Sequence, residues 1–298
     1  MSEYCEGCGI LLFIMLMDGK KVALEIETLL KDIIAKSSTK PTLGILLVGD
    51  DPASVSYVKR KQDFGARIGV DVLVVNLGGD STLEEVGVAT KKLCETSTGC
   101  IVQLPLPNNL SSEKILELIP VGKDVDALTE GAITKFEDNE AGAIVSPVAL
   151  AIRALLSSYK VEVSGKTIAM IGRGKLVGEP VSLLLERMGA KILFADKDTK
   201  DVGEVTRNAD IVVSGAGVPN LVTKEMIKDG AVVLDAGTSE ASGKLVGDVE
   251  KNVEEKASLF APVPGGIGPV TVAMLFVNLF VLAGLVDLET ILKEIRAQ

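Results

Sequence analysis

The first half of the chain alternates apolar runs of strand length with helical patterns. The segment 43–49 predicts a buried strand, 70–77 predicts the next strand, and 99–107 predicts a third strand that ends in two prolines. A helix is predicted to begin near Ser54, a residue type that is favoured at helix N-caps, and a second helix covers 82–95. Strands connected by helices form parallel sheets with right-handed crossovers, so this order predicts an α/β domain.

A second alternation follows a looser stretch and a predicted helix at 148–160. It predicts four strands, "KTIAMIG", "AKILFAD", "ADIVVSGAG" and "AVVLDAG", with helical segments between the first pair and between the last pair. The closing segment 270–285 predicts a strongly apolar helix, which is too short to be assigned to a membrane and is expected in a core. We therefore place a domain boundary near residues 140–147, which gives two domains for 298 residues.

Composition removes several classes of chemistry. The chain has no histidine, which excludes Ser-His-Asp and Cys-His catalysis and every histidine-containing metal site. Its net charge of −10 disfavours nucleic acid and anionic membranes as partners. The four cysteines are Cys5, Cys8, Cys94 and Cys100, and they do not provide two C-x-x-C pairs. We expect reduced, mostly structural thiols, no metal site, and an N-terminal strand within the apolar run 9–17 rather than a targeting segment.

A glycine-rich turn lies between the first strand and the first helix of the second alternation. Gly172, Gly174 and Gly178 precede Pro180, which is tolerated in the first turn of a helix. Glycines at such a turn allow the backbone to approach a pyrophosphate, and the helix N-terminus faces the anion. The pattern favours a dinucleotide site, and a glycine turn without a ligand is the alternative.

The end of the next strand bears on the choice of dinucleotide. Asp196 lies about 20 residues after the turn, where an acidic residue binds the ribose 2′-hydroxyl of NAD. Lys197 is adjacent, and Arg173 lies within the turn, so two cations are available for the 2′-phosphate of NADP. We predict NADP rather than NAD, because a phosphate gains more from two cations than a hydroxyl group does.

The first half of the chain carries the candidate chemistry. Tyr57 and Lys61 are spaced i, i+4 on the helix that begins near Ser54, so they share one face. Packing of the tyrosine ring with a solvent-directed lysine is one interpretation. The other is a desolvated lysine with a lowered pKa that moves a proton or polarises a carbonyl group. Gln103 lies at the carboxyl end of a parallel strand, the usual position of a ligand.

Two loops complete the list of candidates. The sequence "GKDVDAL" supplies Lys123, Asp124 and Asp126, and Asp124 and Asp126 alternate if the loop is extended, so only one would face a site. For Asp124 a solvated loop charge is the favoured interpretation. The proline–glycine segment 261–271 enters the closing helix and can bring bare backbone against a ligand, or simply connect two domains.

These motifs resemble the bifunctional methylenetetrahydrofolate dehydrogenase/cyclohydrolase family, the FolD type, nearly from end to end. The similar segments, in the same order, are "DGKKVA", "GDDPASVSYVKRKQDFGARIGV", "VQLPLP", "KDVDA", "GRGKLVGEP", "GDV" and "PVPGGIGPVT". The resemblance implies oxidation of 5,10-methylenetetrahydrofolate with NADP⁺, followed by hydrolysis of the methenyl form to 10-formyltetrahydrofolate. It also implies a cytoplasmic homodimer.

The resemblance implies a two-domain α/β architecture with the active-site cleft between the domains. A folate domain of residues 1–143 is completed by the C-terminal helix in 271–298, and a Rossmann-type NAD(P) domain covers 144–270. Lys61 matches the family's catalytic lysine. The residues implied at the folate are Tyr57, which positions that lysine, Gln103, which hydrogen-bonds it, Asp126 at the pterin, and Pro264 and Gly265 in a closing loop. At the dinucleotide they are Gly172, Arg173, Gly174, Lys197 and Thr238.

Four departures from the family pattern stand out. Ala127 replaces the usual glycine, "IVSP" at 144–147 replaces "PCTP", Gly174 replaces a common serine, and Lys197 aligns with the serine that often marks the 2′-phosphate site. A monofunctional dehydrogenase for this or another reduced pterin, such as methylenetetrahydromethanopterin, is one alternative. A catalytically silent nucleotide-binding regulator is the other.

Overall fold

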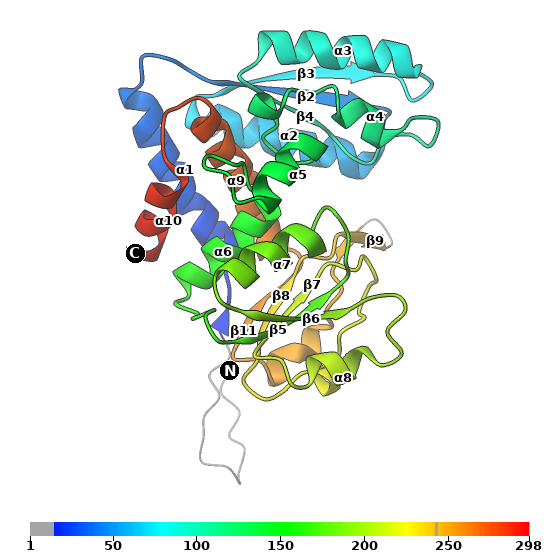
Figure 1. Ribbon diagram of the computed structural model, residues 1–298, viewed down its shortest axis with the longest axis vertical. Helices are drawn as coiled ribbons and strands as arrows, with labels where there is room; N and C mark the ends of the chain where they lie inside the picture. Colours follow the sequence, from blue (N-terminus) through cyan, green and yellow to red (C-terminus); the bar gives the residue numbers. More distant parts are fainter. Residues whose placement is uncertain (1–14, 242–243, 298) are drawn as a thin grey trace. The chain divides into compact units, whose positions relative to one another are not determined.

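The structure, a computed structural model, describes residues 15–241 and 244–297. The chain forms two compact units, each with its own parallel sheet (Figure 1). Among the described residues, the three-stranded unit comprises 21–158 and 269–297, and the six-stranded unit comprises 15–20 and 159–268. Within the described residues, no helix combines the length and the hydrophobicity needed to cross a membrane. The predicted two-domain α/β class is confirmed; Cys5 and Cys8 lie outside the described residues.

The three-stranded unit confirms the predicted β-α-β-α-β order. Strands β2 (Thr42–Val48), β3 (Asp71–Leu77) and β4 (Gly99–Val102) are parallel and adopt the order β3-β2-β4. Because the chain moves outward from β2 to β3 and then back across to β4, right-handed crossovers place the two connecting helices on opposite faces. These helices are α2 (Pro52–Ile68) and α3 (Leu83–Thr96) (Figure 1).

The predicted start of the helix near Ser54 is confirmed, but the predicted N-cap and the predicted end of the third strand are wrong. Helix α2 begins at Pro52, and its N-cap is Asp51, whose carboxylate accepts the backbone N–H of Ser54 at 2.8 Å. Ser54 therefore lies inside the helix, because an aspartate followed by a proline makes the earlier start favourable. The third strand ends at Val102 rather than at 107, and the chain then passes through a cis Leu104–Pro105 peptide.

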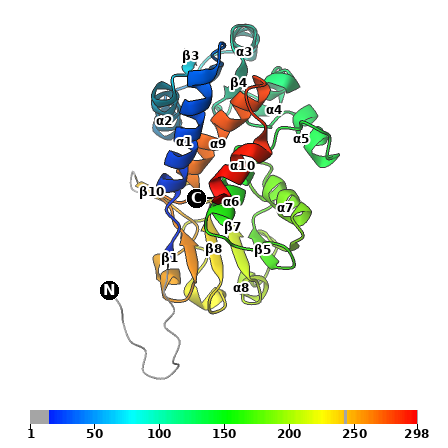
Figure 2. The ribbon, with the colours of Figure 1, turned by 90° about the vertical axis from the view of Figure 1, so that its left-hand side faces the viewer.

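The remaining helices of this unit pack around the sheet and the closing helix. Helix α9 (Ile267–Leu282) is buried over most of its length, as expected for a core helix. Helix α10 (Leu288–Ala297), which was not predicted, packs on α6 (Pro147–Ser158), where Glu289 receives two hydrogen bonds from Arg153 (Figure 2). The others are α1 (Gly19–Lys36), α4 (Ser112–Leu116), and α5 (Glu130–Glu137) in the stretch expected to be irregular.

The six-stranded unit is a parallel sheet in the order β1-β11-β8-β7-β5-β6. The order reverses direction between β5 and β7, which makes the carboxyl ends of these two strands the topological switch point where α/β proteins bind ligands. The strands are β1 (Met15–Leu16), β5 (Thr167–Ile171), β6 (Lys191–Ala195), β7 (Ile211–Ser214), β8 (Val232–Asp235) and β11 (Leu259–Ala261).

The connections of this sheet differ partly from prediction. Helix α7 (Gly178–Arg187) joins β5 to β6 as expected. Between β7 and β8, where a helical segment was predicted, there is only the single 3-10 turn Lys224–Met226. Backbone with positive φ at both ends of this connection, at Asn220 and Gly230, restricts the room for a helix. The short helix α8 (Val202–Thr206), between β6 and β7, was not predicted.

A hairpin and the segment that follows it complete the six-stranded unit. Strands β9 (Ser239–Ala241) and β10 (Lys244–Val246) pair antiparallel after β8. The segment that follows β10 returns to the carboxyl edge of the large sheet, where the backbone N–H of Val222 bonds Asp248 O at 2.9 Å. The residues "GDV" therefore lie beside the ends of the central strands.

Candidate active site

The three-stranded unit brings Lys61 and Gln103 together. Lys61, on α2, donates from Nζ to Oε1 of Gln103 at 2.7 Å. Gln103 follows β4, and its amide nitrogen donates to Leu104 O at 2.7 Å, which fixes the amide with its oxygen toward the lysine. Its backbone N–H extends the ladder to Leu46 O at 2.8 Å. The strand end thus sets the orientation of the lysine's partner.

Asp126 lies in a loop that two other charged residues anchor. Asp124 is buried, and its carboxylate accepts the backbone N–H groups of Leu128 at 2.9 Å and Thr129 at 2.8 Å. Lys123 donates from Nζ to backbone carbonyl oxygens at the end of α3, including Ser97 O at 2.9 Å. The interpretation of Asp124 as a solvated loop charge is wrong, because its carboxylate satisfies backbone donors that the turn leaves unpaired.

Burial shifts the pKa values of the lysine and the aspartate toward each other. The pKa of Lys61 is lowered because burial disfavours the ammonium form, and the negative charge of Asp126 opposes this shift. Burial raises the pKa of Asp126 to about 6, against the opposing charge of Lys61 and with a further contribution from Asp124. An acid and a base that both titrate closer to neutrality are suited to proton transfer.

Tyr57 lies one turn before Lys61 on α2. It is half-buried, and the guanidinium of Arg60 lies 5.2 Å from the centre of its ring. Burial raises the pKa of the phenol, with the charge of Arg60 opposing the shift, so the hydroxyl stays protonated near neutral pH. A protonated phenol can donate a hydrogen bond, and its ring offers a flat surface for an aromatic ligand.

One residue of this unit escaped sequence analysis. Asn278 is buried in the apolar helix α9, and its Nδ2 donates to Val125 O at 2.9 Å and to Val145 O at 2.8 Å. It therefore holds the peptide immediately before Asp126. A lone amide inside an otherwise apolar helix is the signal that could have revealed it, because a buried amide needs partners.

The six-stranded unit places the glycine-rich turn at the carboxyl end of β5. Gly172 has φ +94°, which favours glycine. A Cβ on Gly178 would lie 2.2 Å from Gly172 O, so the turn can close on the start of α7 only with glycine there. Gly174 is exposed, and a Cβ there would meet no atom of the described residues within 4 Å. This tight turn before a helix N-terminus fits a pyrophosphate.

Two of the residues expected near the ribose, Arg173 and Asp196, contact each other beside the same turn. The Arg173 guanidinium stacks 4.1 Å from the ring centre of Phe194, and its Nε lies 3.8 Å from Oδ2 of Asp196. Lys197 is exposed at the end of β6, and Thr238 is exposed after β8. Asp196 therefore contacts one of the two cations that were expected to compete with it.

Pro264 and Gly265 lie in the six-stranded unit, in the loop between β11 and α9. The Val263–Pro264 peptide is cis and Gly265 has φ +108°. The carbonyl oxygen of Gly265 accepts the backbone N–H of Gly19 at 2.9 Å, which ties the loop to the start of α1. A Cβ on Gly19 would overlap Gly266 O at 1.7 Å, so this contact also depends on glycine.

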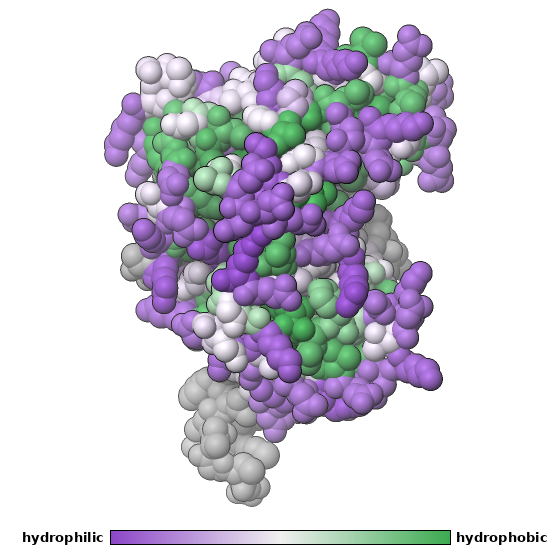
Figure 3. Space-filling model, in the orientation of Figure 1, coloured by the Kyte–Doolittle hydropathy of each residue, from purple (hydrophilic) through white to green (hydrophobic). Residues whose placement is uncertain are grey.

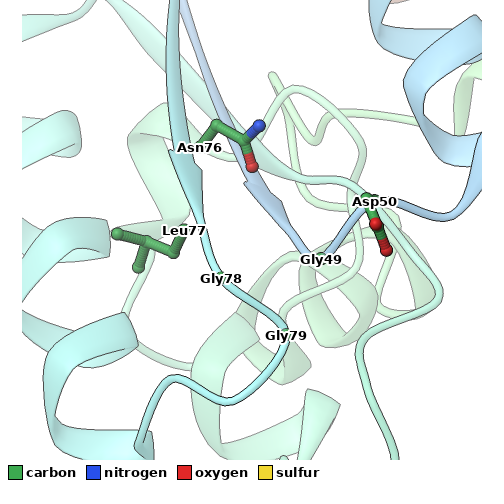
Figure 4. Close-up of a pocket in the computed structure, with 6 residues that line it drawn as sticks. All are labelled: Gly49, Asp50, Asn76, Leu77, Gly78 and Gly79. Carbon is green, nitrogen blue, oxygen red and sulfur yellow. The ribbon is translucent and has the colours of Figure 1, made fainter.

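A surface pocket of the three-stranded unit lies apart from these candidates. It is found at the carboxyl ends of β2 and β3, with Asp50 and Asn76 as its polar side chains (Figure 4). Its other lining residues are Gly49, Leu77, Gly78 and Gly79. None of the predicted site residues lines it, and we assign it no role in the reaction.

Fold and site together define a two-domain α/β enzyme with a Rossmann-type dinucleotide unit. In its other unit Lys61 bonds Gln103, and the charges of Lys61 and Asp126 influence each other. Residues 17–126 match the catalytic domain of the tetrahydrofolate dehydrogenase/cyclohydrolase family, and residues 146–285 match its NAD(P)-binding domain. The chain belongs to this family. The predicted class, a methylenetetrahydrofolate dehydrogenase and methenyltetrahydrofolate cyclohydrolase of one-carbon metabolism, is confirmed.

Individual relatives are similar to this chain over most of their length. The chain is 38% identical to the bifunctional protein FolD of Hydrogenobaculum sp. over 88% of this chain and 96% of the relative. The crystal structure of FolD from Campylobacter jejuni superposes with a TM-score of 0.87 at 34% identity, covering 91% and 99% of the two chains. FolD from Trypanosoma brucei, complexed with NADP cofactor and inhibitor, gives 0.86 at 34% identity, covering 90% and 97%.

Proposed function

We propose that Lys61 is the proton-transfer group of the cyclohydrolase step. Water attacks the electrophilic methenyl carbon, and neutral Lys61 accepts the proton that the water loses. The resulting ammonium then donates this proton to N5 as the carbon–N5 bond breaks. The hydroxyl group of the intermediate releases its own proton to solvent as the C=O bond forms, which leaves the formyl group on N10. The observation that carries this proposal is the 2.7 Å bond from Nζ to Gln103 combined with a lowered lysine pKa.

Gln103, Asp126 and Tyr57 are proposed to position the reactants. The amide oxygen of Gln103 accepts a hydrogen bond from Nζ of Lys61, which orients the lone pair and the other N–H bonds of the amine toward the proposed substrate. Asp126, as a carboxylate, is proposed to accept hydrogen bonds from N–H groups of the pterin ring. The half-buried ring of Tyr57 is proposed to stack on the folate. Pro264 and Gly265 are proposed to contact the folate through their loop.

For the dehydrogenase step we propose NADP⁺ as the cofactor, which supplies the hydride acceptor when it is bound. Gly172 and Gly174 are proposed to receive the pyrophosphate with the N-terminus of α7, and Thr238 to contact the dinucleotide. Arg173 and Lys197 are proposed to bind the 2′-phosphate, because the Phe194 ring holds the Arg173 guanidinium at the end of β6. The NADP complex of the T. brucei relative supports this choice over NAD.

This assignment is tested by initial rates with methylenetetrahydrofolate and either nucleotide. The rates are measured from the absorbance of the reduced nucleotide at ~340 nm. We expect faster turnover with NADP⁺, and Arg173→Ala should raise the KM for NADP⁺ about tenfold or more while changing that for NAD⁺ much less. Lys200→Ala is the control, because Lys200 is an exposed cation that follows Lys197 after β6 and is not proposed to contact the phosphate. Equal rates with both nucleotides, or equal effects of the two variants, would contradict the NADP assignment.

We further propose a cytoplasmic homodimer. Strand β3 is at the edge of its sheet and exposes 41% of Leu73, and α3 exposes 62% of Val88. Apolar side chains reach the surface over these elements in Figure 3. Cys94 and Cys100 are free thiols, which suits a reducing compartment. Light scattering after gel filtration should give twice the chain mass, and Leu73→Lys should reduce it; a wild-type monomer would refute the dimer.

A further inference from the structure

A buried aspartate holds the loop that follows β7. Asp248 is fully buried, and its Oδ2 accepts three hydrogen bonds. The donors are Ser214 Oγ at 2.9 Å, Ala216 N at 2.7 Å and Gly217 N at 3.2 Å. Ser214 is the last residue of β7, so one carboxylate oxygen fixes the path of the chain where it leaves the central part of the sheet.

A second buried aspartate holds the first one in place. Asp235, at the end of β8, accepts the backbone N–H groups of Gly237 and Asp248 on Oδ1, at 2.9 Å and 3.0 Å. Its Oδ2 accepts Val249 N at 3.0 Å. A Cβ on Gly247 would lie 1.9 Å from this oxygen, so the "GDV" turn can approach Asp235 only with glycine.

The loop held by Asp248 forms a wall of the glycine-rich turn. Gly215 N donates to Ile171 O at 2.9 Å, which joins this loop to the end of β5. A Cβ on Gly172 would lie 2.7 Å from Gly215 O, and one on Gly215 would lie 2.5 Å from Val177 Cγ1. The two loops therefore pack backbone against backbone, and a displacement of the 215–217 loop is transmitted to the turn that contains Gly172.

We propose that Asp248 is a positioning residue for the dinucleotide, acting through the 215–217 loop on the glycine-rich turn. This inference rests on the proposed NADP function of that turn. Asp248 does not touch the cofactor in this scheme; it determines whether the turn has the shape that binds a pyrophosphate.

The chemistry of the pair argues for a geometric role rather than for packing alone. Two neighbouring buried carboxylates are an expensive way to fill a core, since apolar side chains of similar volume serve stability as well or better. Oδ1 of Asp248 has no hydrogen-bond partner among the described residues. What the pair supplies is six acceptor contacts to donors around the carboxyl ends of β7 and β8.

The variant Asp248→Asn tests the proposal without emptying the site. The amide oxygen can still receive the three donors, while the amide nitrogen takes the place of the unpartnered Oδ1, so the fold is expected to persist. Loss of the charge weakens all three bonds. We expect the Kd for NADP⁺, measured by calorimetry, and the KM for NADP⁺ to rise about tenfold or more, with cyclohydrolase activity within about twofold of wild type.

Asp210→Asn is the matched control. Asp210 precedes β7 at the opposite edge of the same sheet, where it accepts Thr167 N at 2.8 Å and pairs with Lys228. Its loss should lower the melting temperature but leave the Kd for NADP⁺ within about twofold.

The possible results separate the two hypotheses. An unchanged Kd in Asp248→Asn, or Kd increases in both variants that follow their melting temperatures, would overturn the positioning role. Wild-type protein that binds neither nucleotide would instead refute the proposed cofactor function, and this inference with it. Weaker binding in Asp248→Asn alone, with hydrolysis preserved, would support both.

Discussion

Replacing Lys61 by methionine should separate the two activities. Methionine retains an unbranched side chain of similar length but removes the nitrogen that donates to Gln103 Oε1. General acid–base catalysis contributes about 10²- to 10⁴-fold, so the cyclohydrolase kcat/KM should fall by that factor. At 1.36 kcal/mol per tenfold change, this corresponds to about 3–5 kcal/mol of transition-state stabilisation.

The same substitution should also have an electrostatic effect, because Lys61 in its protonated form restrains the pKa of Asp126. Without that charged form, the pKa of Asp126 should rise above its value of about 6, and a larger fraction of the carboxyl group should be protonated at neutral pH. Removal of the desolvated amine should leave the free energy of unfolding unchanged or slightly increased. A loss of activity with an unchanged melting temperature is therefore the expected signature.

The assay follows the decay of the methenyl form in buffer, with and without enzyme, alongside calorimetric binding of NADP⁺. Lys59→Met is the matched control, since Lys59 lies on the same helix and pairs with Asp63 at the surface. It should change hydrolysis by less than about twofold. Hydrolysis at the wild-type rate in Lys61→Met would refute the proton-transfer role, and an equal loss in Lys59→Met would refute its specificity.

Three further predictions concern the loop of Asp126. Ala127 has φ +55°, so Ala127→Gly should relieve left-handed strain and stabilise the protein by about 1 kcal/mol, measured by urea denaturation; a destabilised variant would contradict this. Asn278→Leu leaves Val125 O and Val145 O without their donor, so it should lower the free energy of unfolding by about 2–4 kcal/mol. It should also raise the KM for folate more than the KM for NADP⁺, and equal changes in the two KM values would contradict this. The pKa of Asp126 in the folded protein, about 6, exceeds the ordinary value of 3.8 for this carboxyl group, so its stabilising contribution is present below about pH 4 and is lost as the pH rises through about 6. Asp126→Asn should therefore be more stable than wild type at pH 8, by at most about 3 kcal/mol, and this difference should vanish near pH 4 in denaturation curves; a constant difference would contradict the shift.

Both parallel sheets could be predicted from the sequence because their central strands are buried on both faces. Runs such as "GILLV" and "IVVS" carry that signal without any tertiary information. The exact ends of helices depend on competition between neighbouring residues that can each act as the N-cap. In α2, Asp51 rather than Ser54 takes this position. Helix α10 was missed although Leu288, Ile291, Leu292 and Ile295 have helical spacing, so the information was present in the chain.

The contact between Lys61 and Gln103 was expected only from the resemblance to the family. The pattern of elements by itself placed Lys61 on a helix and Gln103 at the carboxyl end of a strand. The partners of Asn278 and Asp248 could not be predicted, because all of them except Ser214 Oγ are backbone atoms. A carbonyl oxygen at Val125 or an N–H at Ala216 has no sequence signature, and the first of these contacts spans 153 residues. Such bonds depend on where two loops meet, which the sequence pattern does not specify.

In both units, buried carboxylates accept the backbone N–H groups that would otherwise be unpaired at the ends of the strands. Each has loops at the carboxyl ends of parallel strands, where backbone donors lose their partners in the sheet and must find others. In the three-stranded unit Asp124 supplies acceptors to Leu128 and Thr129, and in the six-stranded unit Asp235 and Asp248 supply them around β7 and β8. A buried carboxylate suits this task because two oxygens can accept several N–H groups at once. Arg173 and Lys197 are exposed, and neither bonds a backbone group among the bonds described. Their charged groups therefore remain available for the proposed phosphate.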